Sequence, residues 1–202
     1  MLIEHRGERP TVHPSSWVAP TAVVSGLVDI GQGSRVLHGA VLTAEGGPIT
    51  IGERCVVMET AVVRASRRHP VRIGDHVLIG PRAYLSGCAI EDRVFLATGS
   101  TVFNGAAVER GAEVRINAVV HLKSRVPAGA TVPIGWVAVG DPAEILPPER
   151  HDRIWAIQKP LNFPKEVFGL DRGDDQGALI AAITTRYSEA LGRHSEDRFV
   201  GE

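Results

Sequence analysis

Two side chains in the first third of the chain, His38 and Glu59, are of the types that perform acid and base chemistry. An imidazole exchanges a proton near neutral pH, and a neighbouring carboxylate can orient the ring. Each lies two places after an aliphatic residue, Val36 or Val57, of a periodic pattern. We therefore expect His38 and Glu59 to be neighbours. They form either the acid/base dyad of a metal-free reaction or a solvated cross-strand pair without a catalytic role.

The structure that must position these side chains is a six-residue repeat that runs through most of the sequence. An aliphatic residue recurs every six positions from Val18 to Leu42, resumes at Ile51, and continues after an insertion at 67–70 as far as Val132. An α-helix of about 3.6 residues per turn cannot keep this period on one face, whereas a prism with three short strands per coil can. The spacing therefore predicts a parallel β-helix.

Three repeats make one coil, so the inward residues form three columns, with successive coils about 4.8 Å apart. The first column is predicted to contain Val18, Val36, Val57, Ile79, Leu96, Val114 and Val132. The second contains Val24, Leu42, Val63, Leu85, Val102 and Val120. The third contains Ile30, Ile51, Ile73, Ile90, Val108 and Val126. Because burial of each aliphatic side chain contributes about 1.5–3 kcal/mol, we expect these columns to dominate stability.

The pattern divides the chain into an expected β-helix domain, residues 1–146, and a C-terminal helical extension, residues 147–202. The extension is predicted to contain a helix over 149–158, which follows two prolines, and a second helix over 174–191. The apolar face of the second helix should lie against the prism or a neighbouring subunit. Between the helices, 159–170 is predicted to be an extended, proline-interrupted crossing.

Composition excludes several classes of function. The formal net charge is -1, and the charged residues are scattered singly, so we expect no nucleic-acid partner. The N-terminus lacks the apolar core of a signal peptide, and no apolar run has the length of a membrane span, so we expect no membrane partner. Cys55 and Cys88 lie far apart and are interpreted as buried hydrophobic residues in a reducing compartment, the cytoplasm.

Four segments resemble the γ-class carbonic anhydrases and their homologues. They are Gly-Pro-Ile-Thr-Ile-Gly at 47–52, Ile-Gly-Asp-His at 73–76, Gly-Cys at 87–88 and Gly-Asp-Pro-Ala at 140–143. The resemblance covers roughly residues 10–146. It implies an all-β fold, a left-handed parallel β-helix of hexapeptide repeats with C-terminal α-helices. It also implies a homotrimer with pockets between subunits.

By the same resemblance, the three zinc-binding histidines of the family fall on Arg64, Pro81 and Ser86. Arginine does not deprotonate and repels a cation, proline has no side-chain donor atom, and serine is a weak ligand. The polar scaffold of the family is also changed, because Thr-Ala-Glu stands at 43–45 and Met-Glu at 58–59. We therefore expect no metal or other cofactor, and no carbonic anhydrase activity.

Arg64 nevertheless keeps a positive charge at the site, with a planar fork of donors suited to a carboxylate or a bicarbonate-like anion. Alternatively, Glu45 or Glu59 from the same or the adjacent subunit neutralises Arg64 in a structural ion pair. The candidate catalytic residues are therefore Glu59, Arg64 and His38. The surrounding pocket is predicted to contain Glu45, Met58, Pro81, Arg82, Tyr84, Ser86 and Asn104.

Three functions are compatible with these features. The first is a γ-carbonic-anhydrase-like pseudoenzyme, a trimer without a functional zinc site, whose inter-subunit pocket binds a small carboxylate or another anion. The second is a metal-free lyase or hydrolase that acts on a carboxylated small molecule in that pocket. The third is a hexapeptide acyltransferase, which is the weakest of the three because the largest insertion, 65–72, is short.

Overall fold

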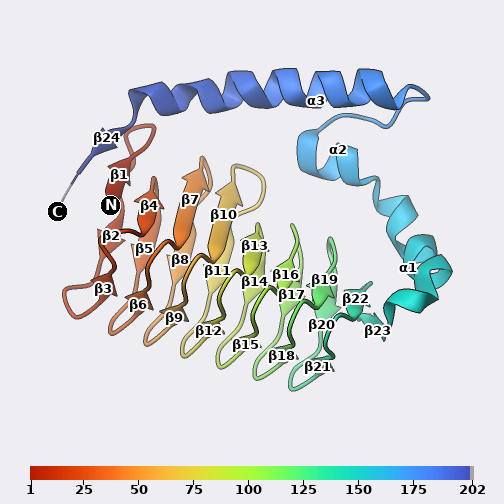
Figure 1. Cartoon of the computed structure of the whole chain (residues 1–202), viewed down its shortest axis with the longest axis horizontal. Helices are drawn as coiled ribbons and strands as arrows, with labels where there is room; N and C mark the ends of the chain where they lie inside the picture. Colours follow the sequence, from red (N-terminus) through yellow and green to blue (C-terminus); the bar gives the residue numbers. More distant parts are fainter. Residues whose placement is uncertain (201–202) are drawn as a thin grey trace.

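The computed structural model describes residues 1–200, and its main body is a triangular prism of stacked coils (Figure 1). Each coil contributes short strands to three sheets whose neighbouring strands are parallel along the prism. The predicted fold is confirmed: the chain is a left-handed parallel β-helix of hexapeptide repeats followed by a few helices. Among the helices of residues 1–200, none combines the length and hydrophobicity that a membrane span requires.

The three sheets are named here after one central strand. The β12 sheet contains β3 (Trp17–Val18), β6 (Arg35–Val36), β9 (Val56–Val57), β12 (Leu78–Ile79), β15 (Phe95–Leu96), β18 (Glu113–Val114) and β21 (Thr131–Val132). The β11 sheet contains β2 (Thr11–Val12), β5 (Val28–Ile30), β8 (Ile49–Ile51), β11 (Val71–Ile73), β14 (Ala89–Ile90), β17 (Ala107–Val108) and β20 (Arg125–Val126). The β10 sheet contains β1 (Leu2–Glu4), β4 (Val23–Ser25), β7 (Val41–Glu45), β10 (Val62–Ser66), β13 (Tyr84–Ser86), β16 (Thr101–Val102), β19 (Val119–Val120), β22 (Val137–Val139), β23 (Glu144–Leu146) and β24 (Arg198–Phe199).

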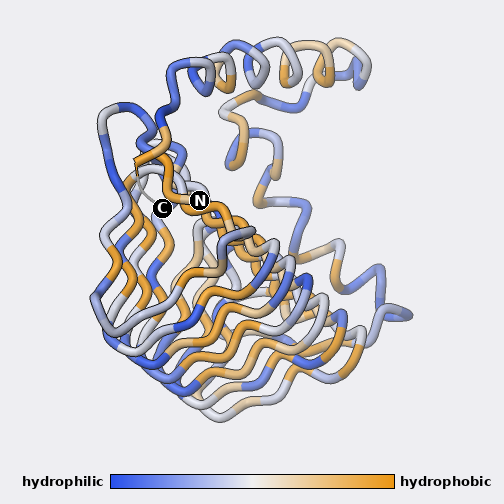
Figure 2. Tube along the Cα trace, turned by 60° about the vertical axis from the view of Figure 1, so that its left-hand side comes forward, coloured by the Kyte–Doolittle hydropathy of each residue, from blue (hydrophilic) through white to orange (hydrophobic). Residues whose placement is uncertain are grey.

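The strand register confirms the predicted columns. Val57 pairs with Val36 on one side and with Ile79 on the other. In the next sheet, Val63 pairs in the same way with Leu42 and Leu85. Figure 2 shows the resulting hydrophobic stretches stacked from coil to coil. The core is therefore a set of aliphatic columns, which hold the outward residues of adjacent coils at fixed spacing.

One glycine controls how the insertion between β10 and β11 folds back onto the prism. Gly87 has a φ of +55°, and a Cβ atom there would lie 2.3 Å from the Cβ of His69 and 2.9 Å from Nδ2 of Asn104. Within the insertion, Ser66 and His69 exchange two backbone hydrogen bonds of 2.9 Å. The absence of a side chain at Gly87 lets this tight turn pack over the end of β13.

The C-terminal extension is more helical than predicted. It contains η1 (Pro148–Arg150), α1 (His151–Gln158), η2 (Lys159–Leu161), α2 (Phe163–Phe168), α3 (Gln176–Leu191) and η3 (Gly192–Glu196). The two predicted helices are present, but the extended crossing predicted at 159–170 is wrong, because η2 and α2 occupy most of it. Pro160 and Pro164 lie in the first turns of these helices, where a missing backbone N–H costs nothing.

Helix α3 returns the chain from the far end of the prism to the N-terminal coil, as Figure 1 shows. It does not lie flat on the strands, and none of its residues is buried. Its apolar side chains instead border cavities shared with α2 and with the insertion after β10. After α3, strand β24 pairs antiparallel with β1, with Phe199 opposite Ile3. The two ends of the described chain therefore lie side by side.

Candidate functional site

The structure brings Arg64 and Ser86 together and places Pro81 elsewhere. Arg64 on β10 lies opposite Ser86 on β13 and opposite Thr43 on β7. Arg64 is partly exposed and Ser86 is nearly buried. Pro81 follows β12 at a different edge of the prism, where it lines a hollow together with Met58. This division agrees with the separation of the two edges that the columns predicted.

A cavity of about 350 Å³ lies between the insertion after β10 and helices α2 and α3. Arg67, Arg68 and Arg186 line it, and so does Tyr187, whose ring centroid lies 5.6 Å from the guanidinium carbon of Arg64. Within residues 1–200, none of these four arginines forms an ion pair with a carboxylate. The cavity therefore combines an aromatic ring with guanidinium groups that form no ion pair in the described part of the chain, and Glu45 lies on its border.

A row of aromatic rings attaches the C-terminal helices to the face of the prism that carries this cavity. From Tyr187 of α3, ring contacts lead to Phe168 at 5.6 Å, and from there to Phe163 at 6.1 Å. Phe163 contacts Phe103 at 6.1 Å, and Phe103 lies 6.4 Å from Tyr84. Tyr84 belongs to β13, the strand next to β10, which carries Arg64. The pocket residue Tyr84 thus helps to support the helices that cover the site.

The side chains of His38 and Glu59 are not joined within residues 1–200. The coils adjoin as predicted, because the backbone N–H of Thr60 donates to the carbonyl of His38 at 3.2 Å. The imidazole, however, is exposed and turns toward the preceding coil, where its Nδ1 lies 2.8 Å from Oγ1 of Thr21. Glu59 takes part in no ion pair of the described chain. Column position fixed the backbones of these two residues but not their rotamers.

The remaining predicted pocket residues are dispersed. Arg82 is exposed in a turn with a left-handed φ of 57°. Asn104 is buried, with its amide close to Gly87. Glu45 borders the arginine-lined cavity, but its carboxylate is engaged by two histidines and forms no ion pair with Arg64. The predicted set therefore does not converge on one pocket within a single chain.

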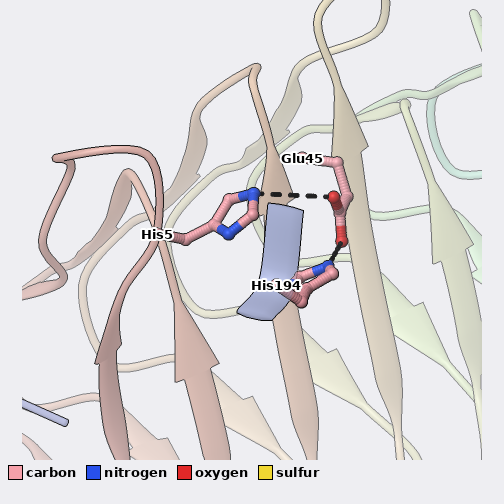
Figure 3. Close-up of side chains that lie close together, drawn as sticks. All are labelled: His5, Glu45 and His194. Atoms are coloured by element: carbon pink, nitrogen blue, oxygen red, sulfur yellow. Dashed lines mark hydrogen bonds and ion pairs between the residues drawn. The ribbon is translucent and has the colours of Figure 1, made fainter. Parts of the chain in front are cut away.

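The sequence did not predict a cluster of titratable groups formed by His5, Glu45, His194 and Asp197. Figure 3 shows His5, Glu45 and His194. Nε2 of His194 lies 3.0 Å from Oε1 of Glu45, and Nε2 of His5 lies 3.7 Å from Oε2. The Nδ1 atoms of His5 and His194 contact the two carboxylate oxygens of Asp197 at 2.6 and 2.8 Å. The two imidazole rings stack with their centroids 4.4 Å apart.

Within this cluster, His194 and Asp197 stabilise each other's charged forms. The hydrogen bond to Asp197, together with the negative charge of Glu45, holds the pKa of His194 above its usual value. Burial alone would raise the pKa of Asp197, but hydrogen bonds from His194 and His5 outweigh it and lower that pKa. No local spacing could have revealed the group, because 149 residues separate Glu45 from His194.

Cys88 and His121 also carry potentially reactive groups, but they lie outside the two sites described above. Burial raises the pKa of the Cys88 thiol to about 12, so Cys88 is not an activated nucleophile. His121 lines a cavity of about 560 Å³ with Trp155 and Phe163. Burial lowers the pKa of His121, and its Nδ1 has no hydrogen-bond partner in the described chain.

Comparison with known proteins identifies the family of the chain. The sequence model of the family described as the hexapeptide repeat of succinyl-transferase matches residues 70–104. Gamma carbonic anhydrase 1, mitochondrial, of Arabidopsis thaliana is 34% identical over 143 residues, which cover 68% of this chain and 50% of that protein. The chain belongs to the γ-carbonic-anhydrase-like hexapeptide-repeat family. It spans about half the length of this relative and of a second one, gamma carbonic anhydrase 2, mitochondrial, of the same plant.

Other members and neighbours extend the comparison. Gamma carbonic anhydrase-like 1, mitochondrial, of A. thaliana is 33% identical over 103 residues, 44% of this chain and 41% of that protein. Among solved structures, a hexapeptide transferase family protein from Anaplasma phagocytophilum aligns with a TM-score of 0.53 and 20% identity over 96% of both chains. This second likeness concerns the fold alone. The family resemblance inferred from the sequence motifs is confirmed.

Proposed function

We propose that this γ-carbonic-anhydrase-like chain is a trimer without a functional zinc site that is not a carbonic anhydrase and binds a small carboxylate or another small anion beside Arg64. The observation that carries this proposal is the group of arginines at the cavity of about 350 Å³ and beside it, none of which forms an ion pair within the described chain. Glu45 also lines the cavity, but its carboxylate pairs with His5 and His194. Guanidinium groups bind planar anions through paired N–H donors. The guanidinium carbon of Arg64 lies over the ring of Tyr187, 5.6 Å from its centroid, and a cation–π contact of this kind does not use up the N–H donors.

The loss of zinc is part of the same proposal. Of the residues at the family's three ligand positions, Ser86 alone carries a donor atom, and a hydroxyl is a poor zinc ligand. Arg64 is its direct cross-strand neighbour, so its positive charge would oppose a bound cation. The same charge favours an anion.

Anion binding is expected to depend on Arg64. Titration calorimetry with succinate and with bicarbonate should detect binding to the wild type, and Arg64→Gln should weaken it about 10- to 100-fold, because a hydrogen bond to a charged group contributes about 1.5–3 kcal/mol. Arg110→Gln is the control, because that side chain is 61% exposed and pairs with Asp92, in turns that follow strands of the β11 sheet.

Equal affinity in Arg64→Gln and the wild type, or the absence of binding by both, would refute the anion site.

Two alternative functions would be recognised by other outcomes. Binding of acetyl-coenzyme A would favour an acyltransferase. Conversion of a bound carboxylated compound into products, without added metal, would favour a lyase or a hydrolase.

The trimer is supported by an apolar hollow of about 470 Å³ near Pro81. It is lined by Met58, Leu78, Phe95, Ile116 and Ile134 among others, and Ile134 is 65% exposed. A second copy of the chain would remove this surface from water, which is favourable at about 25 cal/mol per Å². The hollow lies at the edge where the family alignment places the third ligand position, so the neighbouring subunit would complete the site there.

Light scattering of the wild type should give three times the chain mass of 21.6 kDa. Ile134→Glu should shift the protein toward the monomer, because it would bury an unpaired charge in the interface. Leu27→Glu, which places the same charge at another exposed aliphatic residue, should leave the trimer intact. A wild-type monomer at micromolar concentration would overturn the trimer proposal.

We propose the cytoplasm as the compartment of this protein, because both cysteines, Cys55 and Cys88, are free and buried.

A further inference from the structure

We infer that His5, Glu45 and His194 form a binding site for a divalent transition-metal ion of the Zn²⁺ type, separate from the ligand positions of the carbonic anhydrase family. Each residue offers one ligand atom, and these atoms all lie within 4.8 Å of one another. Tetrahedral coordination with bonds of about 2.0–2.1 Å places ligand atoms about 3.3 Å apart. Nε2 of His194 lies 3.0 Å from Oε1 of Glu45 and Nε2 of His5 lies 3.7 Å from Oε2, so small side-chain adjustments would bring one oxygen and both nitrogens to that spacing.

A buried and unpartnered nitrogen points into the site. His5 is 2% exposed, and its Nε2 makes no hydrogen bond within the described chain. Figure 3 shows this nitrogen directed at the carboxylate of Glu45. Leaving a buried polar atom unsatisfied is costly, and few such atoms occur in native proteins. A metal ion between the two side chains would satisfy the nitrogen and neutralise the carboxylate.

Asp197 orients both imidazoles for this role. Its two carboxylate oxygens bind the Nδ1 atoms of His5 and His194, which leaves the Nε2 atoms to face Glu45. A carboxylate behind a histidine fixes its tautomer and strengthens it as a ligand, an arrangement that accompanies most histidine–metal bonds. The single carboxylate of Asp197 therefore orients both histidine ligands of the proposed site.

The ligand set also selects the kind of ion. Two imidazole nitrogens and one carboxylate oxygen suit Zn²⁺, Co²⁺ or Ni²⁺, whereas Mg²⁺ and Ca²⁺ prefer sites made of oxygen. Three protein ligands leave a fourth position, and His194 is 34% exposed, so water has access from its side. The ion would connect the turn after β1, the end of β7 and η3. It would thereby fasten the C-terminal extension to the first coils of the prism.

The experiment uses the full chain after treatment with a chelator, titrated with Zn²⁺ and with Co²⁺. We expect one ion per chain, a cobalt absorption spectrum of four- or five-coordinate geometry, and a rise in the unfolding temperature with Zn²⁺. His194→Ala and Glu45→Gln should weaken binding at least 100-fold, and Asp197→Asn about 10- to 100-fold. His151→Asn is the matched control, because that histidine is exposed and lies on α1.

The absence of stoichiometric binding by the wild type would overturn the inference and identify the group as a closed ion-pair cluster. Equal binding by His194→Ala and the wild type, with both folded by circular dichroism, would overturn it as well. Glu45→Gln tests the site without removing side-chain volume. Arg64→Gln should keep full metal affinity, so the anion site and the metal site can fail independently.

Discussion

Hydration of carbon dioxide in the presence of this protein is expected to proceed at the protein-free rate. Catalysis of this reaction by the family needs zinc-bound hydroxide, and zinc lowers the pKa of its bound water to about 7. Arg64, Pro81 and Ser86 provide no set of ligands for that ion, and Arg64 lies directly opposite Ser86. Stopped-flow measurement with added Zn²⁺ provides the test. His194→Ala should be measured in parallel, so that an ion at the His5 cluster is not mistaken for the family site.

A rate at least 100-fold above the protein-free control, retained in His194→Ala, would contradict this expectation. Metal binding at the family positions is tested with the triple substitution Arg64→His, Pro81→His and Ser86→His in the His194→Ala background. Because the β-helix holds these backbone positions rigidly, the triple variant should bind one Co²⁺ at each site and show a tetrahedral or five-coordinate spectrum. Its catalytic rate should stay low, since Thr43 and Met58 do not provide the polar support usual in the family.

Leu85→Ala is expected to reduce the free energy of unfolding by about 2–5 kcal/mol. Leu85 is fully buried in the middle of the second column, with Val63 and Val102 directly above and below it. Its removal opens a cavity that rigid neighbouring coils cannot close. Chemical denaturation followed by circular dichroism measures the loss.

The matched control is Leu27→Ala. It is the same substitution of leucine by alanine, but Leu27 is 44% exposed at the surface. This variant should change stability by less than about 0.5 kcal/mol. Similar losses in the two variants would show that the aliphatic columns do not dominate stability. If Leu85→Ala destabilised only the coils next to residue 85, the unfolding transition would become less cooperative.

The regular part of the fold could be predicted from the sequence because its contacts are set by a short period. Once every sixth residue points inward, coil stacking decides which residues are neighbours. The proximity of Arg64 to Ser86 and the distance of Pro81 from both follow from that rule, and the structure agrees. The same rule placed the backbones of His38 and Glu59 in adjacent coils, but it contains no information about rotamers.

Only the tertiary structure decided what surrounds Arg64 and what joins the two ends of the chain. The extension has no period that links it to the prism, so nothing in the sequence predicted that Tyr187 would pack on Arg64. The cluster of His5, Glu45 and His194 depends in the same way on the return of the chain along α3 and on the pairing of β24 with β1. Such contacts follow from the packing of distant segments, and that packing is decided by the whole of the buried surface rather than by local spacing.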